Sequence, residues 1–158
     1  MTRQEMEPSR THGGPAGPLD SRPGYLLKRA HQAFCAATDA GLRNHGLTNV
    51  QYGVLVVLEE AGRLSGAELA RRCYVTAQAM NDLVAGLERR GLVTRQPHPT
   101  HGRVLEVSLT QEGRRTLEAS HRTVLAVEAQ MTGGLDELER EQLIVALRRC
   151  AEQFEGAR

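Results

Sequence analysis

The stretch from Ser65 to Thr110 constrains the fold more than any other part of the chain. It contains a short helix, a tight break and a longer helix, followed by two β runs that a polar loop containing Pro and Gly joins. Apolar residues recur at helical spacing in the longer helix, and they alternate with other residues in the second β run, from Leu105 to Leu109. This order predicts a winged helix-turn-helix, an arrangement that places one helix in the major groove of DNA.

Capping signals place the helix starts. Thr48 followed by Gln51, and Ser65 followed by Glu68, have the spacing of capping boxes, in which side chains satisfy the free N–H groups of a first helical turn. Thr76 is a suitable N-cap for the longer helix of the pair. The helix that Thr48 opens is apolar on several faces, so we expect it to be buried at the centre of this lobe.

Further helices are predicted on both sides of the lobe. Apolar residues recur at helical spacing from about Gly24 to Leu42, from Thr110 to about Gly133, and again after Leu135. The last of these helices carries an apolar stripe formed by Leu143, Leu147, Cys150 and Phe154. The whole pattern predicts a mainly α chain with a small β-hairpin wing, in the α+β class.

Composition excludes several classes of protein. With 158 residues, of which 40% are hydrophobic and only 3% aromatic, the chain is long enough for one domain with an aliphatic core. Its three cysteines are widely spaced and form no CxxC motif, which argues against a disulfide framework and a zinc site. No apolar run approaches the roughly 18 residues of a membrane span, and the polar N-terminus lacks a signal-peptide core. We therefore expect a cytoplasmic protein without a membrane partner.

Catalytic signals are missing from the sequence as well. It offers no pairing of a nucleophile with a base, no Gly-rich phosphate loop and no set of metal ligands, so we expect neither an enzyme nor a bound cofactor or metal. The net charge of +1 does not by itself indicate a nucleic-acid partner. Local clusters matter more, and several Arg pairs supply them, although such a pair is as often an ordinary solvated helix face.

Three motifs carry a resemblance to a known family. They are LTNVQYGVLVVLEEAG, SGAELARRCYVTAQAMNDLVAGLERRGLV and RVLEVSLTQEG. In order and spacing they resemble the MarR family of bacterial winged-helix transcriptional regulators, over roughly Gly24 to Phe154. The resemblance implies a homodimer that binds a pseudo-palindromic operator in double-stranded DNA. We expect a repressor that a small aromatic or phenolic effector releases from its operator.

Four regions are expected along the chain. Residues 1–23 form a flexible N-terminal arm, 24–47 a first dimerisation helix, 48–110 the DNA-binding lobe, and 111–158 two further dimerisation helices. The apolar stripes of the terminal helices support a dimer, because they lie outside the lobe and would be partly exposed in a monomer. A twofold dimer would set two recognition helices about 34 Å apart, which is one turn of DNA.

Contacts to DNA are expected from the longer helix and from the wing. The predicted residues are Thr76, Gln78, Ala79, Asn81, Asp82, Arg95 and Arg103. Gln78 and Asn81 can each donate and accept a hydrogen bond at once, as the reading of adenine in the major groove requires. Thr76 lies at the helix N-terminus, where contacts to phosphate are favoured. Without the helix-turn-helix context, the same residues would be a solvated helix face.

Some positions depart from the family pattern. Asp82 stands where relatives often carry a basic residue, and it could either accept a hydrogen bond from cytosine N4 or repel phosphate. Arg103 matches the Arg that the family places in or near the minor groove. His98 and His101 stand where the family usually has acids, so the wing lacks those acids to orient Arg103 and gains positive charge at low pH.

A cleft between the dimer helices and the DNA-binding lobe binds small aromatic anions in many relatives. By resemblance, the candidate effector-binding residues are His31, Tyr52, Arg63 and His121. For each of them, an ordinary surface or core role is the commoner explanation.

Two alternative functions stay open. Family members that sense peroxide carry a reactive cysteine at the start of the first helix, and this chain has none near Gly24. A redox sensor would have to use Cys35, Cys73 or Cys150, which we predict to be small buried hydrophobes. Asp82 and the near-neutral charge keep open a winged-helix module that binds protein instead of DNA.

Overall fold

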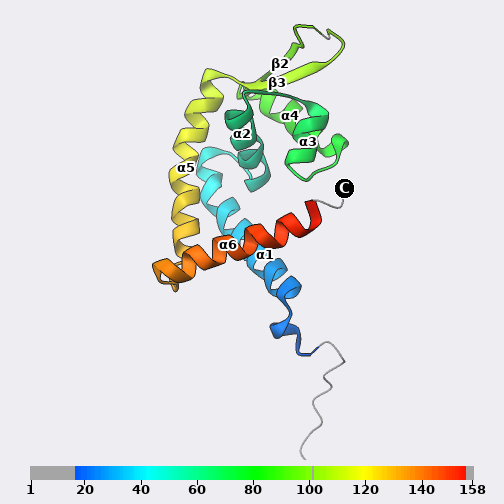
Figure 1. Ribbon diagram of the computed structural model, residues 1–158. Coiled ribbons are helices and arrows are strands. Elements are labelled where there is room, and N and C mark those ends of the chain that lie inside the picture. The colour runs from blue at the N-terminus through cyan, green and yellow to red at the C-terminus, as the bar shows by residue number, and fades with distance from the viewer. Residues whose placement is uncertain (1–16, 101, 156–158) are drawn as a thin grey trace, which may run out of the picture. The chain divides into compact units, whose positions relative to one another are not determined.

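The computed structural model describes residues 17–100 and 102–155 (Figure 1). The chain divides into two compact units, the first ending at Ala33 and the second beginning at Phe34. Most of the predicted N-terminal arm lies outside the described residues. Its final part is ordered into a 3-10 turn, η1 (Leu19–Ser21), and the first helix, α1 (Pro23–Leu42), begins at a proline, which suits the first turn of a helix.

The second unit contains the predicted winged helix-turn-helix and two long C-terminal helices. In chain order its elements are η2 (Arg43–His45), α2 (Asn49–Ala61), β1 (Arg63–Ser65), α3 (Gly66–Arg72), α4 (Ala77–Arg89), β2 (Val93–Pro97), β3 (Leu105–Leu109), α5 (Gln111–Met131) and α6 (Glu137–Glu155). The mainly α fold class with a β-hairpin wing is therefore confirmed.

The sheet has three antiparallel strands in the order β1-β3-β2, where the sequence predicted only two. β2 and β3 form the wing hairpin, with Arg95 opposite Val107. β1 pairs with the other edge of β3 and sets Leu64 opposite Val107. The sequence did not indicate β1 because three residues are too few to show alternation.

The predicted capping box at Thr48 has both of its hydrogen bonds, whereas the one at Ser65 has only the first. The Thr48 hydroxyl accepts a hydrogen bond from the Gln51 N–H at 3.2 Å, and the Gln51 side chain accepts one from the Thr48 N–H at 3.1 Å. The Ser65 hydroxyl likewise accepts from the Glu68 N–H at 3.2 Å. The Glu68 carboxylate, however, binds the guanidinium groups of Arg71 and Arg72 rather than reaching back to Ser65.

The core of the second unit lies around α2, as predicted. Val54, Leu55 and Leu58 of α2 are all 0% exposed. The other helices and strands of the lobe and α5 pack around them through Leu64, Leu69, Met80, Val84, Leu87, Val93, Val107, Leu109 and Leu117. Burying this aliphatic surface is what holds the lobe together.

A close backbone contact fastens α5 to the lobe. The Thr110 N–H donates to the carbonyl of Leu92 at 3.1 Å, and the Thr110 hydroxyl donates to the carbonyl of Gly91 at 2.6 Å. In the first turn of α5, a Cβ on Gly113 would collide with the Leu92 carbonyl oxygen. Only glycine permits the helix to approach the wing strand this closely.

Helix α6 differs from the lobe and from α5, since none of the residues described in α6 is buried. Its predicted stripe faces solvent, with Leu147 and Cys150 exposed and Phe154 77% exposed. The prediction of buried cysteines is thus wrong for Cys150, and Cys35 and Cys73 are only half-buried. A stripe shows which face is apolar but not what covers it. Within the described ranges, no helix is long and apolar enough to cross a membrane.

Candidate nucleic-acid interface

Helix α4, the predicted recognition helix, presents opposite faces to the core and to solvent. Met80, Val84 and Leu87 are buried, and the Thr76 hydroxyl caps the helix by accepting from the Ala79 N–H at 3.1 Å. The residues predicted to contact DNA lie on the other side. Of these, Thr76, Gln78, Asn81 and Asp82 are exposed, and Ala79 is half-buried.

Asp82 has a neighbour that neither predicted role included. The Gln78 side-chain N–H donates to its carboxylate at 3.5 Å, a long hydrogen bond between residues one helical turn apart. Asp82 therefore lies beside the most promising base-reading side chain, where it can influence the orientation of that amide.

Arg95 is partly buried, and its guanidinium binds groups of α4. Its guanidinium donates to the backbone carbonyl of Asn81 at 3.3 Å and lies 3.7 Å from the Glu88 carboxylate. The side chain is half-buried between β2 and α4. Arg95 thus braces the wing strand against the recognition helix, a role that its position in the sequence did not indicate.

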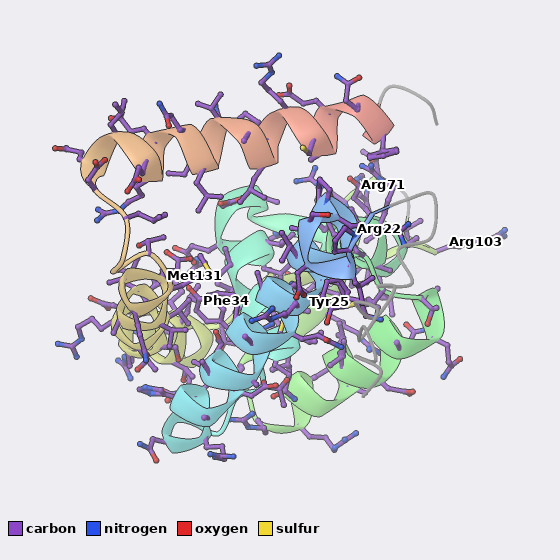
Figure 2. The ribbon with its side chains drawn as sticks, turned by 90° about the horizontal axis from the view of Figure 1, so that it is seen from below. Arg22, Tyr25, Phe34, Arg71, Arg103 and Met131 are labelled. Atoms are coloured by element: carbon purple, nitrogen blue, oxygen red, sulfur yellow. The ribbon has the colours of Figure 1, made fainter. Side chains whose placement is uncertain are left out.

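The wing carries Arg103 on an exposed loop, and its side chain projects away from the ribbon (Figure 2). His98 organises the loop next to it. Its Nδ1 accepts hydrogen bonds from the Thr100 N–H and faces the Thr100 hydroxyl, both at 3.1 Å, and its Nε2 lies 3.7 Å from the Glu106 carboxylate. His101, the other departure from the family pattern, lies outside the described residues.

Basic side chains gather at the end of α3. The Glu68 carboxylate binds Arg71 at 2.6 Å and Arg72 at 2.9 Å, and these hydrogen bonds lower the pKa of Glu68 to about 2. Both arginines are exposed, and Figure 2 labels Arg71. The next turn holds Tyr74, which is 81% exposed and which sequence reasoning passed over.

Two of the four effector candidates meet in the structure. The Tyr52 hydroxyl of α2 lies 2.7 Å from Nδ1 of His121 on α5, with the two rings edge to face. Burial, and secondarily the negative charge of Glu128, raise the pKa of Tyr52. Arg63 lies instead on β1, opposite Ser108. His31 belongs to the first compact unit.

Hollows accompany the two long helices. His121 lines one of about 510 Å³ together with Arg115, Glu118 and Arg122 of α5. A more apolar hollow of about 540 Å³ lies between α5 and α6. Phe34 and Met131, labelled in Figure 2, line it together with Leu125, Leu143, Ile144 and Leu147.

Within residues 17–100 and 102–155, no group of three or more His, Cys, Asp or Glu side chains is placed to hold a metal ion. Burial raises the pKa of the Cys73 thiol, which lowers the fraction of reactive thiolate.

Comparison with known proteins gives one consistent picture. Residues 45–104 match the MarR family. The chain is 37% identical over 120 residues, 75% of its length and 86% of the relative, to the HTH-type transcriptional repressor Rv2887 of Mycobacterium tuberculosis. Among solved structures it is similar to BpsR of Bordetella bronchiseptica, whose DNA binding is regulated by 6-hydroxynicotinic acid (25% identity, TM-score 0.77, 84% of this chain and 94% of that one). It is also similar to a mutant MarR of E. coli complexed with operator DNA (25% identity, TM-score 0.75, 80% and 91% covered).

Proposed function

The chain belongs to the MarR family of transcriptional regulators, and on that premise we propose that it is a homodimeric repressor that a small aromatic or phenolic effector releases from double-stranded operator DNA. One observation carries the DNA-binding part of the proposal. The polar face of α4 is exposed, capped and braced by the wing through Arg95, so the helix is held rigidly for insertion into a groove.

Base reading is assigned to Gln78 and Asn81, whose amides can pair with adenine in the major groove. Thr76 and Ala79 at the start of α4 lie closest to the groove edge, and Arg103 on the wing is free to enter the adjacent minor groove. Asp82 acts by orienting Gln78. Arg95 contributes to DNA binding through its brace and not through direct contact.

Dimerisation is supported by the exposed apolar surface of α5 and α6. Leu125, Leu138, Ile144 and Phe154 all have more than half of their surface exposed. The apolar hollow between the two helices can receive side chains of a second copy, since a twofold interface uses the same patch on both protomers. Burial of this surface in a dimer would also pair the two recognition helices for a pseudo-palindromic operator.

Effector binding is assigned to the region of Tyr52 and His121. Their hydrogen bond joins α2 of the DNA-binding lobe to α5 of the dimerisation region. The hollow beside His121 is lined by two arginines, Arg115 and Arg122, against one acid, Glu118, so its lining is positively charged on balance. An aromatic acid such as the 6-hydroxynicotinic acid that regulates BpsR has the matching chemistry. Such a ligand releases DNA only if it binds the DNA-incompetent arrangement more tightly. The regulator would act in the cytoplasm without catalysis or a cofactor.

Fluorescence anisotropy with duplex DNA tests the DNA-binding part. The full-length chain should select a pseudo-palindromic site from a random duplex pool and bind it with an affinity that falls steeply with salt. Gln78→Ala and Arg103→Ala should weaken binding by roughly tenfold each, whereas Gln142→Ala on α6 should leave it unchanged. Equally weak binding to every duplex, together with a stoichiometric protein partner, would instead favour the protein-interaction module.

A further inference from the structure

Three turns of the second unit share one backbone design. In each, a residue with left-handed φ follows a helix, its N–H bonds to the carbonyl three residues back, and the next N–H bonds to the carbonyl five residues back. Gly46 (φ +66°) and Gly91 (φ +70°) occupy the left-handed position in two of them. Tyr74 (φ +55°) occupies it in the third, between α3 and α4.

Tyrosine is energetically unfavourable at this position of the turn. Left-handed backbone costs an L-residue free energy that glycine avoids, and a bulky residue there is a true outlier. Tyr74 is the only non-glycine with positive φ among the described residues. Because Tyr74 is 81% exposed, its side chain packs little against the rest of the chain, and such packing can offset little of the strain. An outlier of this kind points to a function for the side chain.

The position of Tyr74 indicates what that function is. It lies in the turn of the helix-turn-helix, two residues before the N-cap Thr76 of α4. Arg71, three residues earlier at the end of α3, is exposed as well. In helix-turn-helix proteins the first helix crosses the DNA backbone while the second enters the groove, so the turn between them faces the groove edge.

We propose that Tyr74 is a DNA-contacting residue whose phenol hydroxyl donates a hydrogen bond to a backbone phosphate beside the major groove that α4 reads. The proposal rests on the proposed DNA-binding function. Tyrosine is among the side chains that bind phosphate oxygens in protein–DNA complexes, and such contacts set the register of the protein on the duplex. A glycine in this turn would relieve the backbone but could not reach the DNA.

Two substitutions separate the side chain from the backbone. Tyr74→Phe removes only the hydroxyl, so binding should weaken by about tenfold while the melting temperature stays that of the wild type. Tyr74→Gly removes the side chain and the strain together, so binding should weaken at least as much while the melting temperature rises by about 2–4 °C. Anisotropy with the full-length chain measures binding, both to its selected duplex and to a random duplex of the same length.

A matched control sits in the equivalent turn after α4. A Cβ on Gly91 would meet nothing within 4 Å, so Gly91→Ala should lower the melting temperature through the backbone alone and leave DNA affinity unchanged.

The outcomes distinguish this inference from the function on which it rests. If the wild type binds its selected duplex and both Tyr74 variants bind equally well, Tyr74 does not contact DNA. A loss confined to the selected duplex would overturn the phosphate assignment, since a phosphate contact weakens binding to both duplexes alike. If the wild type binds neither duplex, the proposed function fails and the role of Tyr74 fails with it.

Discussion

The DNA-binding lobe and helix α6 begin from similar sequence signals and reach opposite outcomes. Both α2 and α6 open with reciprocal caps, Thr48 with Gln51 and Asp136 with Glu139. Both carry apolar residues at helical spacing. The apolar side chains of α2 form the centre of the core, whereas none of the residues described in α6 is buried. An apolar stripe therefore shows that a face needs a cover, but not whether the same chain supplies it.

The largest expected effect separates the two regions by stability. Leu58→Ala, at a site that is 0% exposed, should lower the free energy of unfolding by about 2–5 kcal/mol through lost burial and a cavity. Ile144→Ala, at a 51% exposed position of α6, should change it by less than about 0.5 kcal/mol when the protein is dilute enough to be monomeric. Urea denaturation followed by circular dichroism measures both. Similar losses for the two variants would mean that α6 is part of the same core.

The second prediction concerns the second copy of the chain, which is proposed to pack against the apolar face of α6. Ile144→Asp places a charge on the face proposed to meet a second copy, so it should weaken dimerisation by at least about 30-fold, as loss of an interface hot spot does. Gln142→Asp, at an exposed position in the same helix, is the matched control and should preserve the dimer. Sedimentation equilibrium measures the association constants. A dimer that survives Ile144→Asp intact would place the interface elsewhere.

A third, smaller effect compares the two caps. Thr48→Ala should lower the free energy of unfolding by about 1 kcal/mol, because α2 is part of the packed core. Asp136→Ala should chiefly fray the first turn of α6, seen as faster amide hydrogen exchange there with a smaller change in global stability. Equal global losses would show that α6 unfolds together with the lobe.

The smallest expected effect belongs to the ion cluster on the surface of the lobe. The pKa of Glu68 is about 2 in the folded chain against an ordinary value of 4.5, so its contribution to stability is present above pH 4.5 and is lost as the pH falls toward 2. The difference in melting temperature between wild type and Glu68→Gln should shrink across that window. Because Arg71 and Arg72 are exposed and water screens their charges, this effect should be smaller than that of Thr48→Ala. A constant difference would mean that Glu68 titrates normally.

Most of the fold could be predicted from sequence patterns, because capping residues mark the starts of several helices. Thr48, Ser65, Thr76 and Thr110 each cap the helix that follows them, and the periodicity of α4 places Met80, Val84 and Leu87 inside. β1 could not be predicted from the sequence, because its three residues form a strand only through their pairing with β3. The second half of the Ser65 cap failed for a related reason, since Glu68 has two arginines within reach.

The candidate site was predictable as a face but not in its details. Helical spacing put Gln78, Asn81 and Asp82 on one exposed side of α4. It could not show that Arg95 binds the backbone of α4, because that contact depends on the angle between strand and helix. The unusual role of the Tyr74 position could have been predicted from the sequence. Tyr74 follows a helix at a position where the chain elsewhere uses glycine, yet hydrophobic periodicity gives no weight to a turn.

The glycine contact at the foot of α5 makes this helix a lever. Because Gly113 lies against the carbonyl of Leu92, the start of α5 and the first wing strand must move as one body. α5 has 21 residues, so it extends about 30 Å toward the region proposed to bind the second copy. Tilting such an arm by about 5° at its far end displaces the wing by roughly 2–3 Å, comparable to the length of one hydrogen bond. A rearrangement near His121, which lies about halfway along α5, would act over about half that length and displace each wing by about 1 Å for the same tilt.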